Sequence, residues 1–342
     1  MDTTRKTRVI VDAFGGDNAP LEPLKGAVMA VAEYGVQVTL VGNEDTLRAL
    51  AAEHSLSLDG IDIVHTDSVI PMEEHPRAIL KAYKDCSMAV GLRALAAGEG
   101  DAFVSAGSTG ALLMGATFLV KRIKGVSRPA LASIVPGDEG PFMLIDCGAN
   151  VECRPEMLLQ FAHMASVYMT DVIGMPAEEV TVGMVNVGVE ETKGGAFQLE
   201  TYELLKNSDL NFVGNVEARE IPTGHTKVVV TDGFTGNVII KLMEGTIAAL
   251  MGNIKRIFYK NFLTKLAGAI VKPQIGAFKA KMSVDEYGGA PLLGVAAPVI
   301  KAHGNSKACA FKNAIRMAAG FAEAGVVDKL AGLMRKEEVA DE

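Results

Sequence analysis

The sequence predicts an α/β protein, a three-layer α/β/α sandwich built around a mostly parallel sheet. Short β-branched runs alternate with stretches of helical period along most of the 342 residues, and such alternation is typical of βαβ units. Several of these runs are apolar almost throughout, as expected of strands that helices cover on both faces. Hydrophobic residues make up 49% and charged residues 22% of the chain, which supplies a large core and excludes a mainly disordered protein.

The expected elements follow one another along the chain. Strands are predicted at residues 8–12, 36–42, 61–66, 101–107, 142–148, 181–188, 211–216 and 227–233. Helices are predicted at residues 21–34, 77–97, 109–123, 155–173, 196–206 and 237–257. Neither a repeat nor a linker marks an internal boundary, so residues 1–330 are expected to form one domain, followed by a charged tail at 331–342.

Charge and composition exclude several classes of function. Lys and Arg number 33 against 41 Asp and Glu, which gives a net charge of −8 without a basic footprint for nucleic acid. Trp is absent and the four cysteines form no C-x-x-C pair, so neither a base-stacking platform nor a zinc site is expected. No apolar signal segment opens the chain, and the apolar run at 239–250 falls short of the roughly 20 residues of a membrane span. We therefore expect a cytoplasmic protein.

Polar, glycine-rich loops follow many of the predicted strands. Ligands of such sheets bind where strands end, glycines let backbone N–H groups approach an anion, and helix N-termini favour negative charge. The loops together predict a phosphate-binding site. The candidate residues are Asp12, Gly15, Gly16, Ser105, Gly107, Ser108, Thr109, Gly110, Asn150, Asn186, Asp232, Gly233, Thr235, Gly236 and His303.

Standard nucleotide and metalloprotease signatures are missing, because neither G-x-G-x-x-G after a strand, nor G-x4-G-K-[ST], nor H-E-x-x-H occurs. Residues 106–110 resemble the G-x-S-x-G nucleophile elbow with alanine in place of the first glycine. A serine hydrolase that uses Ser108, with His225 or His303 as base, is therefore an alternative. In the simpler interpretation Ser108 and Thr109 cap the following helix.

The loops as a set resemble the bacterial acyl-ACP:phosphate acyltransferase family (PlsX). The motifs are V-D-A-F-G-G-D-N-A-P, S-A-G-S-T-G-A, D-C-G-A-N, N-V-G, G-N-V-E, T-D-G-F-T-G-N and V-I-K-A-H-G. They occur in the family's order at 11–20, 105–111, 146–150, 186–188, 214–217, 231–237 and 299–304. Two positions depart from the family pattern: Asn18 stands where a histidine is usual, and Ser108 where an asparagine is common.

The resemblance implies an activity and a fold. Family members transfer a long-chain acyl group from acyl carrier protein to inorganic phosphate, which gives acyl phosphate for phospholipid synthesis. Their fold is similar to isocitrate and isopropylmalate dehydrogenases and to phosphate acetyltransferase, and they work as homodimers without nicotinamide or metal. The family's catalytic lysine and asparagine correspond to Lys193 and Asn237. A decarboxylating dehydrogenase of the same architecture remains a rival, and so does a non-enzymatic membrane scaffold.

Phosphate is already an anionic nucleophile, so this chemistry needs positioning and charge stabilisation rather than a strong base. Our hypothesis is that Lys193 neutralises and orients phosphate while Asn237 donates to phosphate or to the developing oxyanion. Backbone N–H groups of residues 107–110 and 233–236 are expected to complete the cradle.

Residues 245–284 are basic and lack acidic residues within a net-acidic chain. Phe258, Phe262, Leu266 and Ile270 repeat every four residues, and Lys255 and Lys265 lie among them. The spacing predicts a basic amphipathic helix, which suits an anionic membrane or an acidic partner, unless it forms a dimer or core helix. The resemblance favours the surface role: its implied partners are acyl carrier protein, a membrane surface and the membrane acyl-phosphate:glycerol-3-phosphate acyltransferase.

Overall fold

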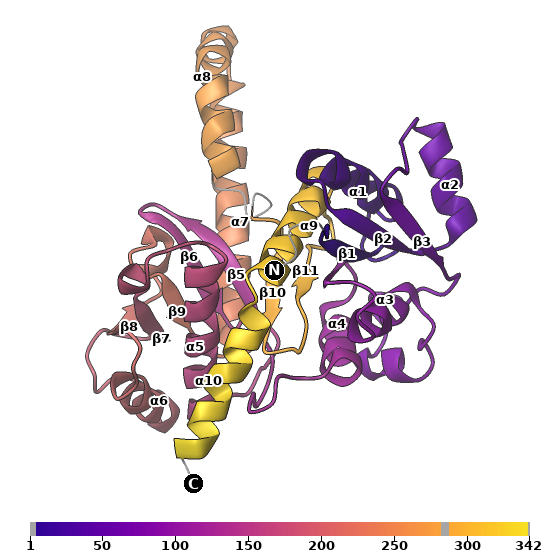
Figure 1. Cartoon of the computed structure of the whole chain (residues 1–342). Helices are drawn as coiled ribbons and strands as arrows, with labels where there is room; N and C mark the ends of the chain where they lie inside the picture. The colour runs from indigo at the N-terminus through magenta and orange to yellow at the C-terminus, as the bar shows by residue number, and fades with distance from the viewer. Residues whose placement is uncertain (1–4, 282–286, 341–342) are drawn as a thin grey trace.

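The computed structural model describes residues 5–281 and 287–340 of the chain (Figure 1). Its described strands form one 11-stranded sheet in the order β3-β2-β1-β4-β11-β10-β5-β6-β9-β7-β8. The strands are β1 (Arg8–Asp12), β2 (Gln37–Gly42), β3 (Ile61–His65), β4 (Ala102–Ser105), β5 (Ala130–Gly137), β6 (Gly140–Ile145), β7 (Val182–Asn186), β8 (Phe212–Glu217), β9 (Val228–Val230), β10 (Ala290–Leu293) and β11 (Val299–Lys301). The helices are α1 (Leu21–Tyr34), α2 (Glu44–Glu53), α3 (Ser87–Ala96), α4 (Thr109–Gly115), α5 (Pro155–Asp171), α6 (Ala196–Lys206), α7 (Gly233–Phe258), α8 (Phe262–Lys281), α9 (Ala308–Glu323) and α10 (Val326–Ala340). A mostly parallel α/β sheet is thereby confirmed.

Strand direction divides the sheet into two parallel groups. The strands β3, β2, β1, β4 and β11 are mutually parallel, as are β6, β9, β7 and β8. Three successive antiparallel pairings, β11–β10, β10–β5 and β5–β6, lie between them. The two groups therefore run in opposite directions, and their strand-end loops leave the sheet in opposite directions.

Alternation along the strands builds the layers on both faces. Val9 and Val11 belong to the core that contains Leu24 of α1 and Phe311 of α9, whereas Ile10 belongs to a second core with residues of α3. Successive side chains of a strand point to opposite faces, so helices cover both sides of β1. Each of these strand residues is almost completely buried, which explains the nearly continuous apolar run in the sequence.

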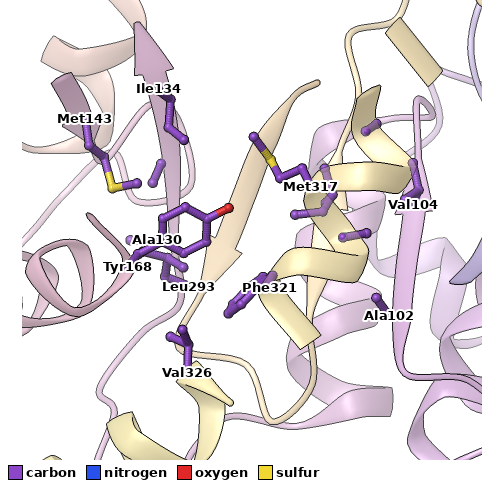
Figure 2. Close-up of a cluster of buried hydrophobic side chains, with 14 of the residues drawn as sticks. Ala102, Val104, Ala130, Ile134, Met143, Tyr168, Leu293, Met317, Phe321 and Val326 are labelled. Carbon is purple, nitrogen blue, oxygen red and sulfur yellow. The ribbon is translucent and has the colours of Figure 1, made fainter. Parts of the chain in front are cut away.

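The two parallel strand groups share one hydrophobic core, in which helix α5 meets helix α9. The ring of Tyr168 on α5 contacts Phe321 on α9 edge to face, with centroids 5.2 Å apart and planes at 77°. Figure 2 shows this pair beside Leu293 of β10 and Val326 of α10. Continuity of packing through the central strands holds both groups of strand-end loops on one scaffold.

Several elements differ from the expectation. The strands β5, β10 and β11 and the helices α2, α9 and α10 were not predicted. The helix expected at 77–97 is a 3-10 turn (Pro76–Leu80) followed by α3. Ser87 N donates to Ser68 O over 3.0 Å, and Cys86 is extended in this bridge, which separates the two pieces. The expected tail is helical to Ala340, and Met334 within it is buried.

The basic segment is a helical hairpin of α7 and α8 that projects from the body (Figure 1). The expected stripe is not on one helix, because Phe258 ends α7 and Phe262 begins α8. The first helix ends with Tyr259 at its C-cap. Asn261 caps the second helix, since its side-chain oxygen accepts from Thr264 N over 2.9 Å. Among the described helices, α7 has the length and composition that could cross a membrane, which alone is weak evidence of a span.

Candidate active site

The first group of loops centres on the buried carboxylate of Asp12 at the end of β1. Ser105 Oγ donates to Asp12 Oδ2 over 2.7 Å and accepts from Gly107 N over 3.0 Å. A side chain at Gly15 would collide with Asp12 Oδ2 and with Gly107 N, at 2.4 and 2.8 Å from its Cβ. Burial raises the pKa of Asp12, although hydrogen bonds from Ser87 and Ser105 oppose the shift. These contacts fix the loop after β4 against the loop after β1.

The loop after β11 closes the same group. Asp17 N donates to Gly304 O over 2.8 Å, and the side-chain amide of Asn18 donates to Asn305 O over 2.9 Å and to Ser306 O over 3.3 Å. Asn18, the departure from the family pattern, thus cross-links two loops in this chain. His303 begins this loop, and its Nδ1 accepts from Asn305 N over 3.4 Å.

Ser108 stands at the N-cap of α4 and is almost completely buried, but its side chain makes no capping hydrogen bond. Neither proposed base is bonded to it in the described part of the chain. The His225 ring is 3.1 Å from Glu139 Oε2, and His303 Nε2 is 3.4 Å from Lys241 Nζ. This geometry does not form the nucleophile–base pair that a serine hydrolase requires.

The second group centres on Asp146, which follows β6 and is completely buried. Its Oδ1 accepts from Leu131 N and Ala149 N, at 3.1 and 3.0 Å, and its Oδ2 accepts from the backbone and side-chain nitrogens of Asn150, at 2.7 and 2.8 Å. Burial raises the pKa of Asp146 against these hydrogen bonds. The carboxylate therefore organises the loop 146–150.

That loop carries the first turn of α7. Gly233 N donates to Asn150 O over 2.7 Å, and a Cβ at Gly236 would lie only 1.9 Å from Asp146 O. Asp232 caps the helix: its Oδ1 accepts from Thr235 N over 2.8 Å, and its Oδ2 accepts from Thr235 Oγ1 over 2.7 Å. The sequence-predicted residues of this turn are brought together, and the glycine is needed for the close approach.

Asn237 follows in this turn and is exposed. An added Cβ at Gly148 would lie 3.6 Å from its Cγ, so the amide sits beside the glycine of the loop 146–150. Exposure leaves the amide able to meet a ligand.

The loop of Lys193 is held by two buried asparagines. Asn186 donates to Lys193 O over 3.1 Å and to Asn215 Oδ1 over 3.1 Å, and Asn215 in turn donates to Glu190 O over 2.9 Å. The Lys193 side chain is 47% exposed and its ammonium is 3.9 Å from Glu190 Oε2. The backbone is thus fixed while the charged end faces solvent. The loop follows β7, and the turn that carries Asn237 follows the neighbouring strand β9.

A cavity of about 690 Å³ joins these last two loops. Its polar wall includes Asn186, Asp232 and Thr235, and its apolar wall is formed by side chains from four elements. The apolar lining residues are Leu158, Met184, Val185, Val187, Phe197 and Ile239. A pocket with apolar walls and a few convergent polar groups is typical of a small-molecule site.

The thiols next to this site are poor nucleophiles. Burial and the nearby carboxylate of Asp146 raise the pKa of Cys147 well above its ordinary value. Burial, Asp146 and Asp232 raise the pKa of Cys153 to about 12. Since the thiolate is the reactive form, neither cysteine is activated at neutral pH. The described residues also contain no cluster of His, Cys, Asp and Glu that could hold a metal ion.

The sequence reasoning missed two lysines, and one of them, Lys241, connects the two groups of strand-end loops. Lys241 lies one turn after Asn237 on α7 and reaches His303 of the other group, and Lys301 is buried at the end of β11. The sequence does mark both positions, because Lys241 interrupts an apolar helical run and Lys301 ends an apolar strand. By contrast, no hydrogen bond between described residues joins the turn 107–110 to the turn 233–236.

Comparison with known proteins identifies the family. The family described as "Fatty acid synthesis protein" matches residues 7–329. A phosphate acyltransferase of Clostridium novyi is 44% identical over 324 residues, which cover 94% of this chain and 97% of the relative. A phosphate acyltransferase of Thermoanaerobacterium thermosaccharolyticum is 45% identical over 323 residues, which cover 94% and 95%.

Solved structures share the fold at low identity. A phosphotransacetylase from Streptococcus pyogenes superposes with a TM-score of 0.63 at 15% identity, over 94% of this chain and 95% of that chain. A 4-hydroxythreonine-4-phosphate dehydrogenase from Klebsiella pneumoniae gives 0.51 at 12% identity, over 94% and 99%. The sequence match to the two phosphate acyltransferases over almost the whole length of the chain confirms the resemblance seen in the strand-end motifs. The chain belongs to the fatty acid synthesis protein family, whose members named above are phosphate acyltransferases, and it is an acyltransferase.

Proposed function

We propose that the protein transfers a long-chain acyl group from acyl carrier protein to inorganic phosphate and so supplies acyl phosphate for phospholipid synthesis. The observation that carries the proposal is the match of nearly the entire chain to phosphate acyltransferases. The site geometry supports it, because a half-exposed lysine and an exposed amide lie on the loops after two neighbouring strands, and other residues of these loops line a cavity with apolar walls.

In the proposed reaction a phosphate oxygen attacks the thioester carbonyl carbon. The tetrahedral oxyanion then collapses, the carbon–sulfur bond breaks, and the carrier-protein thiolate leaves and takes up a proton. Lys193 holds the phosphate by charge, and Asn237 donates to phosphate or to the oxyanion. Preorganised donors of this kind lower the barrier without a covalent enzyme intermediate.

We place the acyl chain in the 690 Å³ cavity. Its apolar wall contains Met184 and Leu158 at the floor, both almost completely buried. Burial of methylene groups stabilises binding by about 0.8 kcal/mol each, so a long chain gains most from such a wall. The polar side at Asn186 and Asp232 then lies next to the thioester end.

The α7–α8 hairpin is our candidate surface for partners. Phe262, Leu266 and Ile270 are 79%, 56% and 69% exposed, whereas Phe258 packs near Gly268 within the hairpin. Lys255 and Lys265 flank the hairpin, each 5.9 Å from the ring of Tyr259.

Exposed apolar and basic side chains together suit an anionic membrane surface. We infer a cytoplasmic homodimer that receives an acidic carrier protein, touches the membrane through this hairpin and delivers its product to the membrane acyl-phosphate:glycerol-3-phosphate acyltransferase.

Steady-state turnover with palmitoyl-carrier protein tests the proposal. We expect thiol release only with inorganic phosphate, and acyl hydroxamate in equal amount when hydroxylamine traps the product. Release without phosphate that Ser108→Ala abolishes would instead support hydrolysis. Absence of release by the folded protein under both conditions would favour a scaffold.

A further inference from the structure

A second cavity, of about 430 Å³, adjoins the cavity of 690 Å³ and is called the outer cavity below. Its walls come from the loop before α5, from α6 and from the turn that leads into α7. The lining residues are Val151, Glu152, Cys153, Phe197, Asp232, Phe234 and Thr235. Its volume lies within the range of about 300 to 1,000 Å³ that is typical of small-molecule pockets.

The two cavities meet at residues that they share. Phe197, Asp232 and Thr235 line both of them. Asp232 Oδ2 accepts from Thr235 Oγ1 over 2.7 Å, so these two side chains are held together at the border. Asn237 follows Thr235 by two positions on α7. The border therefore lies within one helical turn of the amide that donates to the oxyanion in the proposed reaction.

The two cavities differ in how far their walls are exposed. Val151 and Phe234 of the outer cavity are 66% and 63% exposed. Met184 and Leu158 of the larger cavity are almost completely buried. The outer cavity is thus bordered by side chains in contact with solvent, whereas the larger cavity reaches the hydrophobic core.

Hydrogen bonds hold the frame of the outer cavity. Gly233 N and Cys153 Sγ both donate to Asn150 O, over 2.7 and 3.5 Å. A Cβ at Gly233 would lie 2.7 Å from the same oxygen, so the two backbone segments approach as closely as only glycine allows. The exposed side chains of Val151 and Phe234 therefore stand on segments that are fixed against each other.

A carrier-protein thioester extends in two directions from its reacting carbonyl group. On one side is the acyl chain, which gains most from burial. On the other side is the pantetheine arm, an uncharged chain with amides, a hydroxyl and a geminal dimethyl group, which must reach the protein surface. Val151 and Phe234 suit the methyl and methylene groups of such an arm, and the carboxylate of Glu152 can accept from an amide N–H.

We propose that the outer cavity binds the pantetheine arm of the acyl donor, so that the thioester crosses the border at Asp232 and Thr235 and the acyl chain lies in the larger cavity. The inference rests on the proposed function. It assigns Phe234 and Val151 as residues that select the thiol part of the donor, whereas Lys193 and Asn237 serve the reaction itself.

Non-reactive thioethers test the arm separately from the acyl chain. S-decylpantetheine carries the arm, and S-decyl-N-acetylcysteamine carries the same alkyl chain on an arm that ends after its first amide. By calorimetry we expect the wild type to bind S-decylpantetheine about tenfold more tightly, because the outer part of the arm buries methyl and methylene groups. In Phe234→Ala this ratio of dissociation constants should fall to about threefold or less.

A matched control and a second variant accompany this measurement. Phe118→Ala removes an aromatic side chain that is 60% exposed and lies outside both sets of lining residues, so it should keep the wild-type ratio. Val151→Trp fills the outer cavity from the opposite segment and should weaken S-decylpantetheine more than the truncated thioether. In turnover with phosphate, kcat/KM of Phe234→Ala should fall more for decanoyl-pantetheine than for decanoyl-N-acetylcysteamine.

Equal affinity of the wild type for the two thioethers, or an unchanged ratio in both Phe234→Ala and Val151→Trp, would overturn the inference. An unchanged ratio together with a shift of Phe234→Ala from dimer to monomer in sedimentation would show that a second copy of the chain covers this cavity instead. Failure of the proposed function gives a different result, namely a wild type that discriminates between the thioethers but transfers no acyl group to phosphate.

Discussion

Lys241 on α7 brings its ammonium nitrogen within 3.4 Å of His303 Nε2, which follows β11. The two residues come from strand groups that run in opposite directions. One turn earlier on the same helix, Asn237 lies beside Gly148, which follows β6 in the same group as β9. A single helix, anchored at its first turn by Asn150 and Asp146, therefore connects the loops that the chemistry needs.

Replacement of Lys193 by alanine should lower kcat by at least a hundredfold without unfolding the protein. The side chain is half exposed and its ion-pair distance to Glu190 is 3.9 Å, so the free energy of unfolding should change by less than about 0.5 kcal/mol. Lys206→Ala is the control, since Lys206 is an exposed lysine paired with neighbouring Glu191 at 3.0 Å. Near-normal turnover of Lys193→Ala, measured by thiol release, would remove this residue from the mechanism.

Replacement of Asp146 by alanine should destabilise the fold by about 3 to 5 kcal/mol, as measured by urea denaturation. Four N–H donors would lose their buried acceptor. Each fully unsatisfied group costs about 1 to 3 kcal/mol, and water offsets part of this cost because Ala149 and Asn150 are only half-buried. Asp138→Ala, at an exposed position in the turn between β5 and β6, should change the free energy of unfolding by less than about 0.5 kcal/mol. Equal stability of the two variants would show that the carboxylate does not organise the loop.

Ile239→Trp, which adds bulk to the wall of the 690 Å³ cavity, should shift acyl-chain preference. We expect kcat/KM for palmitoyl-carrier protein to fall at least ten times more than that for hexanoyl-carrier protein, because a longer chain needs more of the cavity. Leu242→Trp, at an exposed position of the same helix outside the cavity, serves as the control. A uniform loss at both chain lengths would place the chain elsewhere.

Phe262→Glu/Leu266→Glu should abolish flotation with vesicles that contain anionic phospholipid. Both side chains are exposed on α8, so carboxylates there oppose contact with the surface without loss of core packing. Phe118→Glu, an exposed aromatic position away from the hairpin, should float like the wild type. Undiminished flotation of the hairpin variant would exclude this surface as the membrane contact.

The sequence predicted the elements whose signals are local. The run Val9–Val11 is buried on both faces and is recognisable as a central strand. The strand β10 reads A-P-L-L, without a β-branched residue, and β11 reads V-I-K, in which a lysine ends the apolar run after two residues. The equally short β9 was predicted because it reads V-V-V. The strands β10 and β11 form because β4 and β5 offer partners far away in sequence, which is information that a local pattern does not contain.

In the candidate site, too, the residues with a local sequence signal were predicted, and those placed by contacts distant in sequence were not. Asp232, Thr235 and Asn237 were found because a tight turn leads into a helix, and the turn does cap α7. The contact of Lys241 with His303 spans 62 positions, and the burial of Lys301 depends on neighbours in β4. Sequence reasoning treats a lysine as exposed by default, so both residues were missed. The opposite directions of the strand groups also required the three antiparallel pairings of the structure.

The measurement that tests direct attack by phosphate is a single-turnover experiment with enzyme in excess over palmitoyl-carrier protein. Without phosphate, we predict no burst of carrier-protein thiol, because Ser108 lacks a bonded histidine base and Cys153 has its pKa raised to about 12. Addition of phosphate should then release all thiol in one phase, with acyl phosphate in equal amount. A rapid phosphate-independent burst that matches the bound substrate would show an acyl-enzyme intermediate and contradict the mechanism.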